Sequence, residues 1–224
     1  MFTRISVLFG AEVRANSEEL GHVADFLVEG NLSALLYLLI APSDGEVGTE
    51  LPVPISAAAD LNLAQRSLFL GLSKKELDHL AGIDLLNRPS REKERIIHDL
   101  LHWRPYWMQE NQDVEPDLHS LKRTLGLRVV CSDGPVGALD DFFASATDWS
   151  APLLELNCAQ HLKRRLSLVP TESIESVNWP QQLIRLTATR QHIETAPEYE
   201  GQASLTASEV QAALRHFRSA GKPS

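Results

Sequence analysis

Short apolar runs separated by turn-forming residues dominate the first part of the chain. The runs cover 7–15, 20–28, 35–41, 50–55 and 67–72. They recur about every 8–12 residues, a spacing typical of short strands in an all-β domain. The run at 35–41 is apolar throughout, as expected for a strand that is buried on both faces. Turn residues separate the runs at 16–19, 29–31 and 42–45.

Two later segments have the features of helices. Ser73 and Glu76 form a capping box that predicts a helix at 74–81. A second helix is predicted over 89–102, and Pro105 ends it. Its apolar stripe comprises Ile97, Leu100 and Leu101.

The tail predicts a third helix, over 206–219. Thr206 and Glu209 form another capping box at its start. An apolar stripe follows, and a helix with such a stripe must pack on another element. The stripe comprises Val210, Ala213, Leu214 and Phe217.

Residues 10–77 recur in diverged form at 126–193, with each matching residue displaced by 116 positions. A period this long indicates a duplicated domain, because solenoid repeats are about 20–50 residues long. The matching pairs are Gly10 and Gly126, Val13 and Val129, Gly21 and Gly137, Asp25 and Asp141, Phe26 and Phe142, Pro54 and Pro170, and Leu70 and Leu186.

The duplication predicts two small β domains accompanied by helical segments. We place the first domain at 1–82, a helical, aromatic-ended linker at 83–117 and the second domain at 118–200. A C-terminal helix and tail occupy 201–224. Many short strands favour closed antiparallel barrels, because closure leaves few exposed strand edges.

Composition narrows the range of partners. The hydrophobic content of 43% is enough for two cores, and the net charge of −9 argues against a nucleic-acid-binding protein. The N-terminus lacks the pattern of a signal peptide. The longest apolar run, 35–41, is far shorter than the roughly 20 residues that a membrane span requires. The sequence therefore predicts a cytoplasmic protein without a membrane span.

His98 and His102 carry the strongest signal for catalysis. Two histidines four residues apart on a helix share a face and can bind zinc. Metalloproteases of this type place a glutamate after the first histidine, whereas this chain has Asp99. The sequence also contains neither a glycine-rich phosphate loop nor a nucleophile elbow. We expect no catalytic residue, no metal and no cofactor, and a hydrolase centred on the two histidines is one alternative.

Several short motifs together resemble those of tandem PRC-barrel proteins of bacteria. The stretch 126–142 resembles the opening hairpin of that family, and 20–28 is its copy in the first domain. The resemblance covers about residues 5–200. Its other motifs lie at 89–94, 102–107, 117–120, 177–179, 183–186 and 196–199.

This resemblance implies a mainly β protein with two tandem small antiparallel PRC-type β-barrels, a helical linker and a short C-terminal helix. The same barrel occurs in the cytoplasmic part of the photosynthetic reaction-centre H subunit and in ribosomal small-subunit maturation factors. In both it serves assembly or interaction. The resemblance therefore implies a non-enzymatic protein-interaction or assembly module.

Four matched pairs form the fold motif. Gly21 and Gly137 follow hairpin turns, where glycine permits a bulge or a close approach of strands. Asp25 and Asp141 are expected to bond to a nearby turn, and a shared ligand-binding carboxylate is the alternative. The remaining members are Phe26 and Phe142 as core residues and Pro54 and Pro170 at strand ends.

The end of the linker concentrates aromatic residues. Trp103, Arg104, Tyr106 and Trp107 form either a recognition patch for a partner or a brace that packs the linker on a barrel. We expect Trp107 to brace the fold, because Pro105 ends the helix beside it.

The expected partner is therefore a protein rather than a nucleic acid, and a homodimer is a further alternative. The second hypothesis for the function is a small-molecule- or metal-responsive stress protein that uses the cleft between the barrels.

Overall fold

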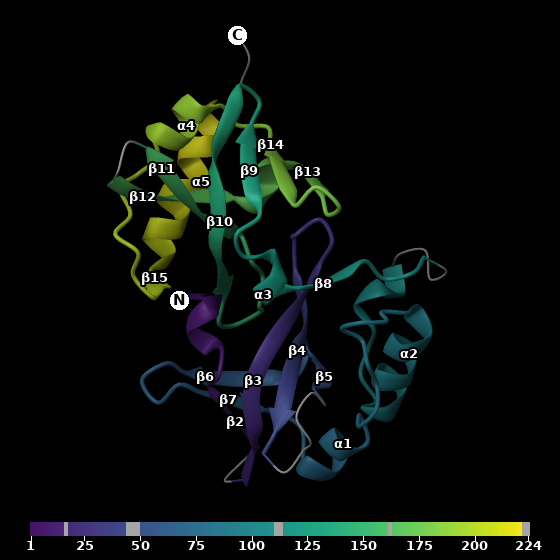
Figure 1. Ribbon diagram of the computed structural model, residues 1–224. Helices are drawn as coiled ribbons and strands as arrows, with labels where there is room; N and C mark the ends of the chain where they lie inside the picture. Colours follow the sequence, from purple (N-terminus) through teal and green to yellow (C-terminus); the bar gives the residue numbers. More distant parts are fainter. Residues whose placement is uncertain (16–17, 44–49, 110–113, 161–162, 221–224) are drawn as a thin grey trace. The chain divides into compact units, whose positions relative to one another are not determined.

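The computed structural model is mainly β, with 42% strand and 24% helix (Figure 1). It describes residues 1–15, 18–43, 50–109, 114–160 and 163–220. Residues 16–17 of the turn predicted at 16–19 and residues 44–45 of the turn predicted at 42–45 therefore lie outside the described residues. The strands form two mixed sheets.

The first sheet has the strand order β5-β4-β3-β2-β7-β6, and β8 pairs with β3 on one side of this path. Its long central strands carry the most apolar segments of the first repeat, so they are buried on both faces. The strands are β2 (Glu12–Ala15), β3 (Glu18–Glu29), β4 (Leu35–Pro42), β5 (Leu51–Pro54), β6 (Ala58–Asn62), β7 (Ser67–Leu70) and β8 (Leu118–Ser120).

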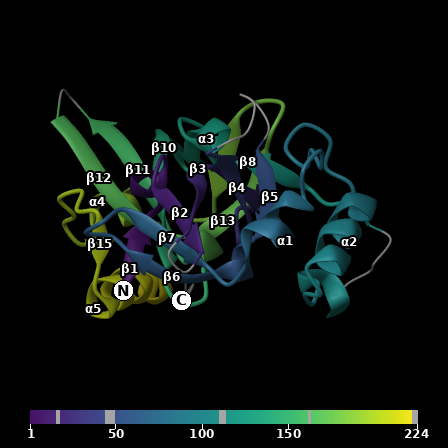
Figure 2. The same cartoon turned by 90° about the horizontal axis from the view of Figure 1, so that it is seen from below.

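The second sheet has the order β12-β11-β10-β9-β14-β13. Strand β1 pairs with both β10 and β15. Strands β11 and β12 form a long antiparallel ribbon (Figure 2). The strands are β1 (Phe2–Arg4), β9 (Arg128–Cys131), β10 (Gly134–Ser145), β11 (Leu153–Gln160), β12 (Lys163–Pro170), β13 (Ile174–Asn178), β14 (Leu183–Leu186) and β15 (Ser204–Leu205).

The three predicted helices are present: α1 and α2 are shorter than predicted, and α5 is displaced by one residue. The capping box of Ser73 and Glu76 starts α1, as the sequence predicts. The α-helices are α1 (Lys74–Asp78), α2 (Arg91–Leu100), α3 (Leu121–Thr124), α4 (Arg190–Glu194) and α5 (Ala207–Ala220). Four 3-10 turns accompany them, namely η1 (Ile5–Leu8), η2 (Ile55–Ala57), η3 (Tyr106–Gln109) and η4 (Thr171–Ser173).

The structural repeat extends further than the sequence match. Six pairs of elements have bounds that differ by the same 116 positions: β2 and β9, β3 and β10, β6 and β13, β7 and β14, η2 and η4, and α1 and α4. The same displacement relates β1 to β8 and η1 to α3. It also relates the first residue of α2 to the first residue of α5. The linker helix and the C-terminal helix are therefore equivalent elements of the two repeats.

The leading strands of the two repeats are exchanged. Strand β1 pairs with β10, so that Arg4 lies opposite Phe143. Strand β8 pairs with β3, and the equivalent residue Ser120 lies opposite Leu27 (Figure 1). Each repeat therefore completes its sheet with the first strand of the other repeat.

Two compact units result, and each is discontinuous in sequence. The first-repeat unit comprises Leu8–Gly30 and Leu35–Lys122. The second-repeat unit comprises Met1–Val7, Asn31–Ala34 and Arg123–Ser224. Continuous segments such as 1–82 and 118–200 do not describe these units, because pairing partners rather than chain order decide where each strand lies.

Closed antiparallel barrels are not formed by the described strands, contrary to the sequence prediction. Each strand order begins and ends on a different strand. Each sheet also contains one parallel pair, β2 with β7 and β9 with β14. The spacing of turns predicts where strands begin and end. It does not predict that β7 pairs with β2, or β14 with β9, because these strands are far apart in the sequence.

Gly21 and Gly137 lie where two strands approach closely. A Cβ atom on Gly21 would come within 2.2 Å of the Ala41 carbonyl oxygen, and one on Gly137 within 2.1 Å of the Asn157 carbonyl oxygen. The register of the pairing with the preceding strand shifts at both glycines. No side chain fits at either position, so these glycines permit the central hairpin of each sheet.

The remaining fold-motif residues are buried in their units. Phe26 and Phe142 are almost fully buried in the cores. Pro54 ends β5 and precedes η2, and Pro170 ends β12 and precedes η4. The fixed φ of proline suits the change from strand to 3-10 turn.

The exchange of strands makes a prediction about truncation. Deleting residues 1–7 removes β1 from between β10 and β15, although these residues precede the first repeat in the chain. We expect the amides of β10 and β15 to lose hydrogen-exchange protection while those of β3 and β4 keep theirs. Hydrogen exchange followed by mass spectrometry measures this difference. A primary loss of protection in β3 and β4 would contradict the exchange.

Candidate functional site

Asp25 is a buried carboxylate that accepts hydrogen bonds from β8 and the residues that follow it in the first-repeat unit. Its Oδ1 accepts hydrogen bonds from the backbone N–H of Phe26 at 2.8 Å and of Lys122 at 3.1 Å. Its Oδ2 accepts a hydrogen bond from the hydroxyl of Ser120. The bond to the next residue is local, as expected of an aspartate near a turn, but the other two bonds join it to the exchanged segment.

Asp141 does the same for β1 in the second-repeat unit. It accepts hydrogen bonds from the backbone N–H of Phe142 at 2.8 Å and of Ser6 at 3.2 Å. The Arg4 guanidinium donates to it at 2.9 Å through Nε. Ser6 and Arg4 occupy the same repeat positions as Lys122 and Ser120, so both aspartates hold equivalent segments.

A cluster of charges surrounds Arg4. Besides Asp141, Arg4 donates through Nη2 to Asp140 at 2.8 Å and to Glu155 at 2.7 Å. The hydroxyl of Tyr199 donates to the other oxygen of Glu155 at 2.8 Å. The side chains of Asp141 and Glu155 are fully buried. Three carboxylates thus share one guanidinium, which leaves the cluster with excess negative charge.

Burial in this cluster changes protonation. Burial raises the pKa of Glu155 to about 7, and the hydrogen bond and charge of Asp140 act in the same direction. The hydrogen bond from Tyr199 and the charge of Arg4 oppose this rise. Burial also raises the pKa of Asp141. Glu155 is therefore poised to gain or lose a proton near neutral pH.

The charge cluster belongs to the second repeat alone. The first repeat has Ala24 at the position of Asp140, Leu39 at that of Glu155 and Ile83 at that of Tyr199. Because the two sheets share one topology, the fold itself does not require these polar residues.

A different polar network lies beneath α2 in the first-repeat unit. Arg91 donates to Glu94 Oε2 at 2.6 Å, and the Tyr106 hydroxyl donates to Glu94 Oε1 at 2.8 Å. The hydroxyl of Tyr37 lies 3.2 Å from His98 Nε2. Glu94 and His98 are both buried. Burial raises the pKa of Glu94, against the opposing effects of the Tyr106 hydrogen bond and the Arg91 charge, and burial lowers the pKa of His98.

This network again has an apolar counterpart in the other repeat. Val210, Leu214 and Leu153 occupy the positions of Glu94, His98 and Tyr37. Val210 and Leu153 belong to an apolar cluster against which Leu214 packs. Each repeat thus has buried polar contacts where the other has apolar residues, but at different places.

The predicted aromatic patch is divided between the interior and the surface. Trp107 is only 2% exposed. Its ring lies 4.4 Å from the Arg91 guanidinium carbon and 4.8 Å from the His98 ring. Trp103 is partly buried, whereas Arg104 and Tyr106 are exposed. Trp107 therefore braces the linker on its unit, and only the other residues are available to a partner.

The two histidines do not share a helical face. His98 points into the unit, whereas α2 ends at Leu100 and His102 adopts a left-handed conformation with φ of 54° beyond the helix. Within the part of the chain that is described, no three His, Cys, Asp or Glu side chains gather in a way that could hold a metal ion. The prediction of a continuous helix to residue 102 is therefore wrong by two residues.

The outer face of α2 exposes two large apolar side chains. Ile96 is 43% exposed and Leu100 is 38% exposed. The sequence placed Leu100 in the buried stripe together with Ile97 and Leu101, but only these last two are buried. Glu94 and His98 lie on the buried face of α2, and Leu100 lies outside this face.

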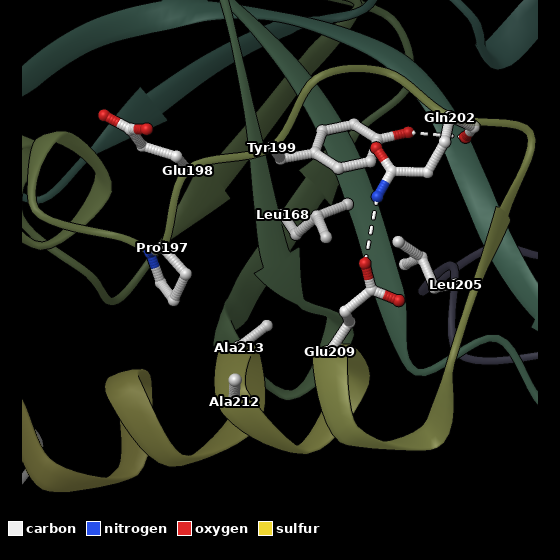
Figure 3. Close-up of a pocket in the computed structure, with 9 residues that line it drawn as sticks. All are labelled: Leu168, Pro197, Glu198, Tyr199, Gln202, Leu205, Glu209, Ala212 and Ala213. Carbon is white, nitrogen blue, oxygen red and sulfur yellow. Dashed lines mark hydrogen bonds between the residues drawn. The ribbon is translucent and has the colours of Figure 1, made fainter.

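A small pocket lies between α5 and the segment that precedes β15 in the second-repeat unit (Figure 3). Its volume is about 80 Å³. The ring of Tyr199 forms one wall, so the pocket adjoins the charge cluster through the hydroxyl that bonds to Glu155. The other lining residues are Leu168, Pro197, Glu198, Gln202, Leu205, Glu209, Ala212 and Ala213.

No protein-family model matches the chain, and no curated protein matches it. None of the described helices has both the length and the apolar character needed to cross a membrane.

The protonation of Glu155 predicts how stability depends on pH. The folded state keeps a proton that the unfolded chain releases near its ordinary pKa of 4.5. The stability from this group is therefore complete below pH 4.5 and is lost as the pH rises towards about 7. We expect the free energy of unfolding to fall by about 3 kcal/mol relative to Glu155→Gln between pH 5 and 8. Urea unfolding at several pH values measures it, and parallel curves for the two proteins would refute the assignment.

Burial of Trp107 predicts a large effect on stability. Truncating a buried aromatic side chain costs about 3–5 kcal/mol, so Trp107→Ala should lower the melting temperature sharply. Trp103→Ala removes the same ring from a partly exposed position and serves as the matched control. Equal losses in the two variants would show that Trp107 does not brace the linker.

Proposed function

We propose that this chain is a non-enzymatic protein-interaction module built from two PRC-type units, with the outer face of α2 as its contact surface. The observation that carries this proposal is the exposure of Ile96 and Leu100. The equivalent positions on α5 hold Ala212 and His216. Because α5 folds with alanine and histidine at these two positions, the equivalent helix α2 does not need isoleucine and leucine there in order to fold.

The surroundings of the pair suit a protein partner. Glu92, Arg95 and Asp99 are exposed on the same helix, so an apolar centre is bordered by charges of both signs. Such a centre with a polar rim is the usual anatomy of a protein interface. Tyr106, which is 39% exposed, adds a residue type that is common among binding hot spots.

The network beneath α2 supports the same proposal. Glu94 receives bonds from Arg91 and Tyr106, and His98 meets Tyr37 and Trp107. These contacts fix the rotation of the helix and therefore the direction in which its outer face points. A pre-ordered face binds with a smaller loss of entropy than a mobile one.

The PRC-type assignment is supported by the repeated architecture. Both sheets share one strand order, and the glycine and Asp-Phe motifs occupy equivalent places in β3 and β10. The non-enzymatic assignment is supported by the state of the buried charges. Arg4, Glu94 and Glu155 are each bonded to protein groups.

A paired capture experiment tests the contact surface. Wild-type protein and the double variant Ile96→Ala, Leu100→Ala are each used to capture partners from lysate of the native cell, with mass spectrometry as the readout. We expect the double variant to lose a partner while its stability changes by only about 0.5 kcal/mol, as is usual at surfaces.

Val114→Ala is the matched control, because Val114 is also apolar and 56% exposed. It should retain the partner. Sedimentation of the purified chain identifies a homodimer as the interacting species. Identical captured proteins from wild type and the double variant, with no change in sedimentation, would contradict the proposal.

A further inference from the structure

The pocket in the second-repeat unit has an apolar floor. Leu168, Leu205 and Ala213 belong to the buried apolar cluster of this unit. The pocket volume of about 80 Å³ is several times the roughly 10–15 Å³ that admits one water molecule. It therefore has room for a short aliphatic chain.

The polar groups at the mouth are mainly acceptors. Glu209 Oε1 accepts a hydrogen bond from Gln202 Nε2 at 3.0 Å across the mouth (Figure 3). Bonds from Thr206 lower the pKa of Glu209, so its carboxylate stays ionised. Tyr199 directs its hydroxyl to Glu155 and to the Gln202 carbonyl. No lysine or arginine is among the lining residues.

In the first repeat, side chains of the chain itself occupy the region that corresponds to the pocket. Lys93 lies at the position of Glu209, and its ammonium donates to the carbonyl oxygens of Asp84 at 2.8 Å and Arg88 at 2.6 Å. Ile97, which is buried, stands where the second repeat has Ala213. The first repeat thus supplies both aliphatic bulk and an ammonium group between the helix and the preceding loop.

The second repeat lacks both of these features. Ala213 lacks the methyl and methylene groups that Ile97 provides, and Glu209 stands at the position of the cation Lys93. The chemistry that is missing is an aliphatic stem that ends in a positive charge.

We propose that this pocket binds a primary alkylammonium group, with its stem against Leu168, Leu205 and Ala213 and its ammonium at Glu209. The ammonium displaces the Gln202 amide from the carboxylate, because a charged donor forms the stronger hydrogen bond. This binding is independent of the contact surface on α2, which lies in the other unit.

Titration of the full chain followed by methyl NMR tests the proposal. n-Butylammonium chloride should shift the methyl signals of Leu168, Leu205 and Ala213 in a saturable way at pH 7, whereas sodium butyrate should not. Titration with N-acetyl-lysine methylamide shows whether the alkylammonium group belongs to a lysine side chain or to a free amine. Tighter binding than n-butylammonium indicates a lysine side chain of a polypeptide, and weaker binding indicates a free amine.

Substitutions separate the pocket from the general negative charge of the protein. Glu209→Gln keeps the capping geometry but removes the charge, and should weaken n-butylammonium binding at least about tenfold. Glu200→Gln removes the same charge from an exposed side chain that is not among the lining residues, and should leave binding unchanged.

Filling the pocket provides the second test. Ala212→Ile changes an exposed helix position, so the fold should persist, and Ala213→Ile fills the floor directly. Each should abolish the saturable shifts. The proposal is overturned if butyrate binds equally, if Glu200→Gln weakens binding as much as Glu209→Gln, or if a folded filled variant still binds.

Discussion

The two buried aspartates that hold the exchanged strands are the constraint on which the rest of the structure depends. Asp25 and Asp141 each bond to the residue that follows them and to a segment from the other repeat. A buried carboxylate is stable only when its oxygens are satisfied. Each unit therefore completes its interior with the leading strand of the other repeat.

Divergence between the repeats has concentrated in buried polar groups. The second repeat holds Arg4 among three carboxylates, and the first repeat holds Glu94 and His98 beneath α2. Replacing buried charges by well-packed apolar residues is often neutral or stabilising, and the sister repeat supplies such residues at each place. These polar groups are therefore not needed for the stability of the fold. Their effect is to fix orientation, of α2 in one unit and of β1 and Tyr199 in the other.

The equivalent helices α2 and α5 present different side chains from the same position in the two units. Both begin at the same repeat position and pack on equivalent strands. On α2 the outer face exposes isoleucine and leucine, and Lys93 ties the helix to the preceding loop. On α5 alanines leave a pocket beside Glu209. The first supports a proposal of protein contact, and the second supports a proposal of alkylammonium binding.

The sequence by itself determined the period of 116, most strand positions, the capping boxes and the two close-approach glycines, because local chemistry encodes each of these. It placed Phe26 and Phe142 in the cores for the same reason. Only the tertiary structure decided that β1 and β8 are exchanged, that one pair in each sheet is parallel and that Leu100 faces outwards. These features depend on which distant segment satisfies a buried group. The common displacement of 116 positions and the packing on β5 and β12 identify α2 and α5 as equivalent, although their buried faces differ in polarity.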